Sequence, residues 1–390
     1  MKNLYLKFVV LLFFIASKVN AQVDYGTFKD RTIINPADSQ QLSFNLYNLD
    51  YLHNTEWFGN IPLSGTLFGY EVIPEIEYQV SPKLMLKAGI YLQKEFGRPN
   101  YTTLAPTFEV KYRAKHSSYI IGNLEGNMNH GFIDPIYDYK LLINEHLENG
   151  FQFLVDTKPY DHDLFINWRR AIHPGDKFKE EFDIGYVANL HLLNKNNWDV
   201  HFPLQLLYSH KGGQYDSLNT PLQSLTNMAT GVSVSYNFDR KFFKKIVFDN
   251  YYVNYKDISG TKVQPFNEGN AFLSHLLFQF KNVGIDFRYW YGDAYIGPRG
   301  MALFQSVSEK YPHAGPSGGP LVERHRELLI ASFIFDKEIY KNVFFDFRII
   351  PYKDFLEKIS SGTGLEYSYE MYLKYKLKVN LKKVKNSLDS

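Results

Sequence analysis

The chain of 390 residues contains no cysteine. This absence excludes a disulfide-stabilised scaffold and any metal site that depends on thiolate ligands. We also expect no lipid anchor of the lipoprotein type, because the signal-peptide cleavage site expected after Ala21 is followed by Gln22 rather than cysteine. The fold therefore depends on noncovalent packing and hydrogen bonding.

Long apolar runs are scarce as well. Lys2 and Lys7 accompany an apolar segment over residues 8–16, and Ala21 ends a short small-residue sequence that fits a cleavage site. We therefore expect a secretory signal peptide over residues 1–21. The alternative is a retained anchor, which the short run disfavours because a spanning helix needs about 20 apolar residues. No run of that length follows, so the sequence predicts no transmembrane helix.

Charges of the two signs are nearly balanced. The formal net charge is +2, and removal of the leader with its lysines changes it to −1. Such a balance creates no strong field toward polyanions, so we expect no nucleic-acid partner.

Aromatic side chains and strict alternation are abundant by contrast. The chain holds 30 tyrosines and 32 phenylalanines. From residue 365 to residue 381 every odd position is apolar, and every even position except Tyr372 is polar or charged. This period of two places the two sets on opposite faces of a β-strand about three times as long as the usual 5–6 residues. Such a strand suits a barrel wall with lipid on one face and water on the other.

The same alternation recurs along the chain and predicts about sixteen strands between residues 41 and 381. Short connections with turn residues alternate with longer ones, such as 127–149 and 297–325. Short periplasmic turns and long external loops are typical of outer-membrane barrels. We therefore predict an all-β fold, a transmembrane antiparallel β-barrel over residues 41–381. A periplasmic lead-in at 22–40 would precede it, and a C-terminal tail at 382–390 would follow it.

In these features the chain resembles bacterial outer-membrane β-barrels of the porin-like type. Its aromatic-rich strands without cysteine look like barrels of Bacteroidota-type bacteria. The resemblance is architectural, since no motif names a specific family. It implies residence in the cell outer membrane after export, with outer-membrane lipid as the surrounding partner. A soluble exported β-sandwich or β-helix is the structural alternative, and it predicts shorter strands.

The charged side chains on the polar faces of the strands are the candidate functional residues. Charges on a water-filled lumen cost little and tune selectivity, whereas a charge facing lipid at mid-depth costs about 2–4 kcal/mol. Because a sixteen-stranded barrel usually leaves an aqueous channel, we expect a porin-like channel for small polar solutes. The pore-lining candidates are Glu109, Lys111, Arg113, Arg169, Asp286, Arg288, Asp346, Arg348, Lys374 and Lys376. The alternative is that these charges pair across strands and fill the lumen.

The loops leave further alternatives open. If the long loop 127–149 folds inward, then Asp134, Asp138 and Glu145 would form a constriction; a solvated external loop is equally compatible with the sequence. A lumen closed by this loop or by 297–325 would favour a structural barrel. Its partners would be other envelope proteins of a secretion or export machine.

Signals for an enzyme or a metal are weak. His116 and Ser118 resemble the His-x-Ser spacing of outer-membrane phospholipases, but the flanking residues differ and no third orienting group is evident. Asp161, His162 and Asp163 offer ligand atoms, yet adjacent strand residues point to opposite faces. A barrel hydrolase is therefore the least favoured alternative. We expect no enzymatic activity, no catalytic residue, no metal and no cofactor.

Overall fold

The computed structural model describes residues 26–213, 215, 218–315, 318–356 and 366–384. The predicted signal peptide and most of the predicted C-terminal tail lie outside these described residues. Within them, none of the helices has the length and apolar character needed to cross a membrane.

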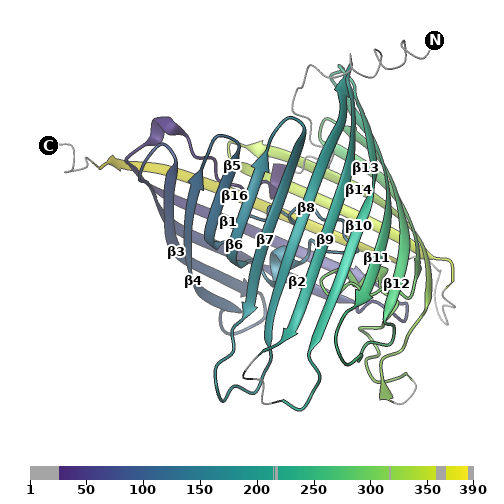
Figure 1. The fold of residues 1–390 in the computed structure, drawn as a ribbon. Coiled ribbons are helices and arrows are strands. Elements are labelled where there is room, and N and C mark those ends of the chain that lie inside the picture. Colours follow the sequence, from purple (N-terminus) through teal and green to yellow (C-terminus); the bar gives the residue numbers. More distant parts are fainter. Residues whose placement is uncertain (1–25, 214, 216–217, 316–317, 357–365, 385–390) are drawn as a thin grey trace, which may run out of the picture.

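Sixteen antiparallel strands in the described residues form one closed barrel, in which each strand pairs with its sequence neighbours and β1 pairs with β16 (Figure 1). The prediction of an all-β antiparallel barrel is therefore confirmed. The strands are β1 (Gln41–Glu56), β2 (Gly65–Gln79), β3 (Leu84–Glu95), β4 (Thr103–Arg113), β5 (Ser117–Asn123), β6 (Asn149–Asp156), β7 (Tyr160–Arg170), β8 (Glu180–Lys195), β9 (Trp198–Gly212), β10 (Gln223–Asn237), β11 (Phe243–Asp257), β12 (Glu268–Phe280), β13 (Val283–Asp293), β14 (His325–Tyr340), β15 (Val343–Asp354) and β16 (Glu366–Lys383). Short helical turns are η1 (Gly26–Phe28), η2 (Pro36–Asp38), α2 (Leu141–Asn144) and η3 (Ala302–Phe304).

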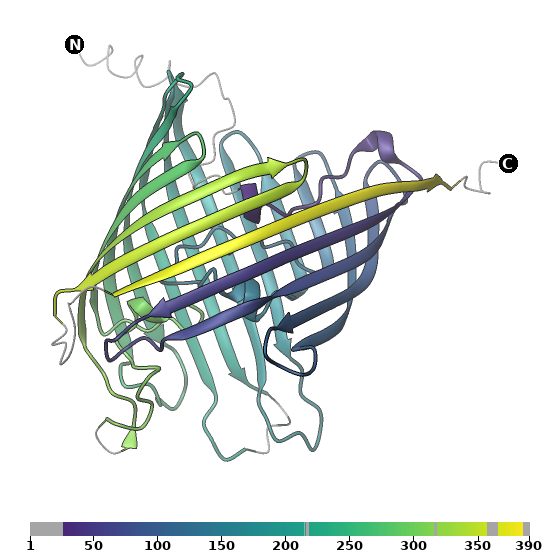
Figure 2. The same ribbon diagram turned by 180° about the vertical axis from the view of Figure 1, so that it is seen from behind.

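The first and last strands close the barrel. Asp50 pairs with Leu373 and His53 pairs with Glu370, and Figure 2 shows β1 and β16 side by side across the front of the barrel. Closure satisfies every strand edge, which is the condition for a sheet to span a membrane.

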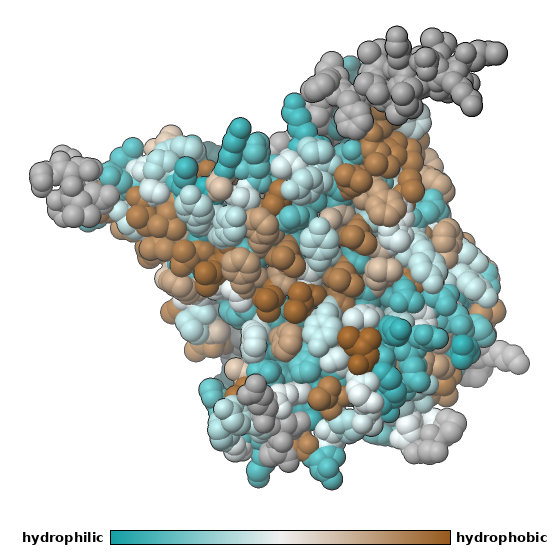
Figure 3. Space-filling view, in the orientation of Figure 1, coloured by the Kyte–Doolittle hydropathy of each residue, from teal (hydrophilic) through white to brown (hydrophobic). Residues whose placement is uncertain are grey.

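Alternation along β16 sorts its side chains as the sequence predicts. Met371 and Leu373 are 41% and 37% exposed on the outer surface, whereas Glu370 and Lys374 face the interior and are buried. Tyr372, the exception in the pattern, is buried inside, where its ring meets Phe28 edge to face at 5.0 Å. Apolar side chains gather over the strands, and hydrophilic ones gather toward the long loops at the lower edge of Figure 3.

The two ends of the barrel differ in the length of their connections. Asn196 and Asn197 form the two-residue turn between β8 and β9, and both have positive φ, 54° and 69°. That conformation matches the twist of a tight hairpin, and Asn tolerates it well. The opposite end carries the longer connections, which include residues 124–148 and 294–324.

The loop between β5 and β6 folds into the barrel and crosses its interior. We name residues 124–148 the inner loop. Its polar contacts reach four parts of the wall. Gln93 of β3 donates to the Ile143 carbonyl at 2.7 Å, and Tyr139 donates to Glu370 of β16. The carbonyl oxygen of the Gln205 amide on β9 accepts from the Ile133 backbone N–H at 3.0 Å, and Arg288 of β13 pairs with Asp134 at 2.5 Å. The inner loop is therefore an internal element that divides the lumen.

The loop between β13 and β14 packs against the inner loop. The Asp138 N–H donates to the Arg299 carbonyl at 2.8 Å, and the Met301 N–H donates to the Asp134 carbonyl at 2.9 Å. Gly300 lies between these bonds, where an added Cβ would be 1.8 Å from the Pro135 carbonyl oxygen. Only glycine allows the two backbones to approach this closely.

The segment before β1 also enters the barrel. Thr32 accepts from Lys87 through its hydroxyl at 3.0 Å and from Lys111 through its carbonyl at 2.6 Å. Arg31 pairs with Asp163 of β7, and Phe28 packs in a buried cluster with residues of β1 and β16. Part of the expected periplasmic lead-in thus fills the lumen opposite the long loops.

Candidate functional site

His53, His130 and His146 lie in the barrel interior at or beside the inner loop, and the partners of their ring nitrogens distinguish them. His130 and His146 belong to the inner loop, whereas His53 belongs to β1. A histidine acts as a general base only if one ring nitrogen is unprotonated and faces the substrate. The partners of each nitrogen therefore indicate which ring can act chemically.

Both nitrogens of His130 are engaged by carboxylates. Nε2 lies 2.6 Å from Glu148, and Nδ1 lies 2.9 Å from Asp163 of β7. Burial lowers the pKa of His130, but the two carboxylates outweigh this and raise the pKa to about 9. The ring also stacks on Phe165 with centroids 3.8 Å apart. His130 is therefore a charged structural link between the inner loop and the wall.

His146 is held by a carboxylate on one side only. Its Nδ1 lies 3.1 Å from Glu71 of β2 and 3.2 Å from the Leu142 carbonyl. Tyr91 of β3 donates to the same Glu71 oxygen at 2.7 Å, and its ring stacks on the imidazole with centroids 5.4 Å apart. Among the described residues, Nε2 has no hydrogen-bond partner. A carboxylate at Nδ1 fixes the tautomer that leaves a lone pair on Nε2.

His146 lines a cavity of about 360 Å³, which we name the His146 cavity. This volume falls within the range of small-molecule sites, about 300–1,000 Å³. The cavity lies where the inner loop meets the long-loop ends of β3, β4, β7 and β8. Its lining residues are Tyr91, Gln93, Thr103, Asn144, Glu145, His146, Leu147, Asn149, Asn167, Arg169, Arg170 and Glu181.

Cations and carboxylates share the wall of this cavity. Arg169 Nε lies 3.2 Å from Glu145, and Arg169 Nη2 lies 3.2 Å from Glu181. Arg299 binds Glu145 through both terminal nitrogens at 2.9 and 2.8 Å. Burial raises the pKa of Glu145, but the hydrogen bonds and charge of Arg299 outweigh this, so the pKa is lowered. The half-exposed Arg170 is the cation best placed to meet an external anion.

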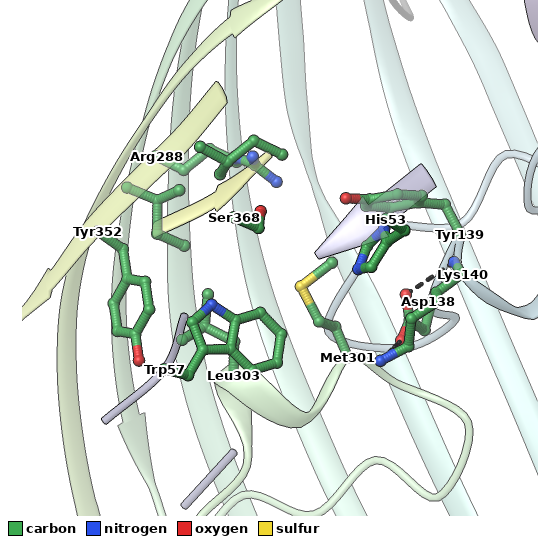
Figure 4. A pocket seen from close by; sticks show the side chains of 12 residues that line it. His53, Trp57, Asp138, Tyr139, Lys140, Arg288, Met301, Leu303, Tyr352 and Ser368 are labelled. Atoms are coloured by element: carbon green, nitrogen blue, oxygen red, sulfur yellow. Dashed lines mark hydrogen bonds and ion pairs between the residues drawn. The ribbon is translucent and has the colours of Figure 1, made fainter. Parts of the chain in front are cut away.

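His53 faces a second, smaller cavity (Figure 4). Its Nδ1 lies 3.4 Å from both Glu370 and the Tyr372 hydroxyl, and its buried Nε2 has no partner among the described residues. Figure 4 shows His53, Tyr139 and Lys140 on one side and Trp57, Ser368 and Tyr352 on the other. The volume is about 20 Å³, enough for one water molecule. His53 therefore has a base-like geometry without room for a substrate.

The structure places most of the predicted pore-lining residues inside the barrel in polar pairs. Lys111 binds Glu125 of the inner loop, Glu109 binds Lys87 at 2.7 Å, and Asp346 binds Arg348 at 2.7 Å. The remaining candidates have these partners: Arg113 with the Ile34 carbonyl, Arg169 with Glu145 and Glu181, Asp286 with Arg288, Arg288 also with Asp134, Lys374 with the Lys29 carbonyl, and Lys376 with Asp30. Their role in selectivity stays a prediction.

The three predicted constriction residues separate within the inner loop. Asp134 binds Arg288, and Glu145 binds Arg299 and Arg169. Asp138 lies beside Lys140 in the small cavity of Figure 4. Burial raises the pKa of Asp134 to about 6, although Arg288 opposes this effect. Asp134 and Glu145 therefore anchor the inner loop to other parts of the barrel, whereas Asp138 pairs within the loop, and the three residues do not form one acidic ring.

The weaker sequence signals do not gather into sites. His116 is exposed in the turn between β4 and β5, and Ser118 lies at the start of β5. Asp161 binds His191, and Asp163 binds His130. His162 lies among the aromatic rings of Phe153, Tyr160 and Tyr186. A different group, His191, Asp199 and His201, brings ligand atoms together.

Sequence reasoning missed Glu71 and Tyr91. Glu71 occupies a position of β2 whose side chain faces the interior, between the apolar outward positions Tyr70 and Val72. The sequence does show that Glu71 is an acidic residue on the interior face of a strand. It does not show that His146 is the partner of Glu71, because His146 lies far along the chain in a loop.

A family model described as lipid A 3'-O-deacylase-type matches residues 34–384. The chain belongs to this family. The expectation of no enzymatic activity is therefore wrong at the level of the family, whose name is that of an ester-cleaving enzyme. That expectation depended on the absence of a convincing His-x-Ser motif, but a hydrolase that activates water needs no such motif.

Solved structures with a similar arrangement include bacterial outer-membrane proteins. The outer-membrane protein OprD from Pseudomonas aeruginosa has 10% identity and a TM-score of 0.48, with 87% of this chain and 94% of that chain covered. OmpT of Vibrio cholerae, in its trimer form, has 6% identity and a TM-score of 0.49, with coverage of 86% and 100%. OccAB3 of Acinetobacter baumannii has 9% identity and a TM-score of 0.47, with coverage of 86% and 99%. No curated protein sequence matches the chain.

Proposed function

We propose that this protein is an outer-membrane hydrolase that removes an ester-linked acyl chain from a phosphorylated glycolipid of the lipid A kind. The observation that carries this proposal is the His146–Glu71 pair, because the imidazole whose Nε2 is free lines a cavity of about 360 Å³. The family match supports the choice of an acyl ester as the scissile group.

The chemistry needs one activated water. The Glu71 carboxylate accepts from His146 Nδ1–H, so the lone pair on Nε2 removes a proton from water. The resulting hydroxide attacks the ester carbonyl, the tetrahedral intermediate collapses, and the leaving alkoxide takes a proton from Nε2–H. Glu71 stabilises the imidazolium during this cycle, as an orienting carboxylate does in other histidine-based hydrolases.

The arginines of the same wall support a phosphorylated substrate. Arg170 is half-exposed, and its nearest carboxylate oxygen, on Glu181, is 3.8 Å away. A guanidinium binds phosphate through two parallel hydrogen bonds, so Arg170 suits the phosphate of a glycolipid headgroup. Arg169 already forms ion pairs with Glu145 and Glu181, so we assign it the role of positioning these two carboxylates in the cavity wall.

The test is acyl release from purified lipid A by the refolded full-length mature protein, measured by mass spectrometry. His146→Asn is expected to lower the rate by about 10²–10⁴-fold, the usual contribution of a general base. His116→Asn is the matched control, because His116 is exposed in a turn and its substitution should leave the rate unchanged. Barrel folding is checked by the electrophoretic mobility of unheated protein.

Two results would overturn the assignment. Full activity in His146→Asn with loss in His53→Asn would move the reaction to the small cavity of Figure 4. Absence of acyl release from any phosphorylated glycolipid would reject the hydrolase itself.

Solute passage is the second candidate function, and the His146 cavity favours it because charged side chains surround a space large enough for small polar molecules. Conductance of the folded protein in a planar bilayer tests it. Stable ohmic steps whose ion selectivity changes in Arg169→Glu would support passage along this wall. No conductance from inserted protein would reject passage.

A further inference from the structure

We propose that His191, Asp199 and His201 form a binding site for one divalent transition-metal ion of the zinc type, separate from the His146 cavity. His191 lies on β8, and Asp199 and His201 lie on β9. One donor atom from each residue can be chosen so that all three lie within 4.8 Å of one another. The inference does not depend on the proposed hydrolase activity.

Strand register explains why these residues meet. His191 and His201 are direct partners across the β8–β9 pair, and Asn194 pairs with Asp199 nearer the turn. A register shift between His191 and Leu193 changes the pairing just before the turn. Asp199 and His201 are two residues apart on β9, so their side chains share the interior face on which His201 meets His191. The sequence spacing alone does not reveal this group.

The hydrogen bonds of His191 orient it as a ligand. Its Nε2 lies 2.8 Å from Asp161 of β7, and Asn189 donates to the other Asp161 oxygen at 3.0 Å. A carboxylate at one ring nitrogen of a metal-ligating histidine fixes the tautomer and leaves the other nitrogen free to bind. That other nitrogen, Nδ1, is buried and has no hydrogen-bond partner among the described residues.

The free nitrogen of His191 lies near the Asp199 carboxylate, which would be the second ligand. His191 Nδ1 is 3.9 Å from Asp199 Oδ2, beyond hydrogen-bond range, and His201 Nδ1 is 3.1 Å from Asp199 Oδ1. Metal–ligand distances of about 2.0–2.2 Å separate tetrahedral donors by roughly 3.4 Å. Because all three donors lie within 4.8 Å of one another, any two of them must approach by at most about 1.4 Å to surround an ion.

The donor set selects the class of ion. Two imidazoles and one carboxylate suit Zn²⁺ and its first-row neighbours, whereas Ca²⁺ and Mg²⁺ prefer sites made of oxygen ligands. With three protein ligands, a fourth position is left for water or another small ligand. Asn194 donates to Asp199 Oδ2 at 3.1 Å and would hold the carboxylate in place.

Lys245 of β11 is the competing cation. It is buried, and its charge is close enough to interact with Asp199 and Asp249. An ammonium near the carboxylate opposes binding of a divalent ion by charge repulsion. Removal of this charge should therefore strengthen metal binding, which a merely structural His–Asp cluster does not predict.

The experiment titrates metal-stripped, folded full-length mature protein with Zn²⁺ by calorimetry and with Co²⁺ by visible absorption. We expect one Zn²⁺ per chain and a Co²⁺ spectrum of low coordination number. Asp199→Asn keeps the side-chain shape and should abolish stoichiometric binding. Asp161→Asn should weaken binding by about 10–100-fold, as loss of an orienting carboxylate does elsewhere. Lys245→Met should tighten binding.

His116→Asn is the control for adventitious surface binding, because His116 is exposed and distant in the barrel order from β8 and β9. It should leave both titrations unchanged. Stoichiometric binding that survives in Asp199→Asn would overturn the assignment, as would the absence of binding to the folded wild-type protein. Unheated gel mobility of each variant separates loss of the site from loss of the barrel.

Discussion

His146 of the inner loop and Glu71 of β2 meet with Nδ1 3.1 Å from the carboxylate oxygen, although they come from distant parts of the chain. Burial lowers the pKa of His146, but Glu71 and its hydrogen bond outweigh this effect and raise the pKa above its ordinary value of 6.5. The pKa of the proposed base His146 is therefore raised only while the inner loop holds the imidazole beside Glu71.

The pH profile of acyl release should show that link. Because the base must be unprotonated, activity is lost as the pH falls through the raised pKa of His146. Glu71→Gln removes the negative charge while it keeps the shape, so the acidic limb should move to lower pH and the maximal rate should fall. The rate of ester cleavage measured from pH 5 to pH 10 checks this. An acidic limb that stays in place would contradict the role of Glu71.

His130 should stabilise the inner loop in a pH-dependent way. Its pKa is raised to about 9 by Glu148 and Asp163. Stabilisation by the charged ring is complete below the ordinary pKa of about 6.5, and it is lost as the pH rises through about 9. Limited proteolysis of the folded protein should therefore cut within residues 124–148 more readily at pH 10 than at pH 7.

His130→Ala should remove this pH dependence and expose the loop at both pH values. Removing one partner of a buried charge cluster costs about 3–5 kcal/mol, because the carboxylates of Glu148 and Asp163 remain without their cation. His173→Ala, in an exposed loop, is the control. Equal cleavage of His130→Ala and wild-type protein at pH 7 would contradict stabilisation of the inner loop by His130, Glu148 and Asp163.

Gly300 should be required for the contact between the two inward loops. A Cβ at this position would meet the Pro135 carbonyl oxygen at 1.8 Å, so Gly300→Ala must displace one backbone. We expect faster proteolysis of residues 124–148 and a lower thermal unfolding midpoint. Gly260→Ala is the matched control, because nothing lies within 4 Å of the Cβ position there. Equal behaviour of the two variants would argue against tight packing at Gly300.

The Arg288–Asp134 pair should keep the lumen narrow. Arg288 Nη1 of β13 lies 2.5 Å from Asp134 Oδ2 of the inner loop, and both side chains are mostly buried. Arg288→Ala should release this anchor and increase single-channel conductance in a planar bilayer. Arg324→Ala breaks an exposed pair with Asp293 and serves as the control. Unchanged conductance in Arg288→Ala would show that this anchor does not limit passage.

Much of the architecture could be predicted because it depends on local alternation. The odd and even positions of residues 366–374 divide between the outer surface and the interior as the sequence indicates. The interior position of Arg288 and Arg348 follows from the same parity. Parity does not give the partner of each charge, and Arg288 binds the inner loop whereas Arg348 binds Asp346 of its own strand.

The sequence by itself determined the barrel and its two faces, because a period of two fixes which side chains lie on each face of a strand. The tertiary structure alone decided that the inner loop enters the lumen, that His146 meets Glu71, and that His191 lies beside Asp199. These contacts depend on strand register and on loops that cross the barrel. They join residues from separate strands and loops, so no local pattern in the sequence encodes them.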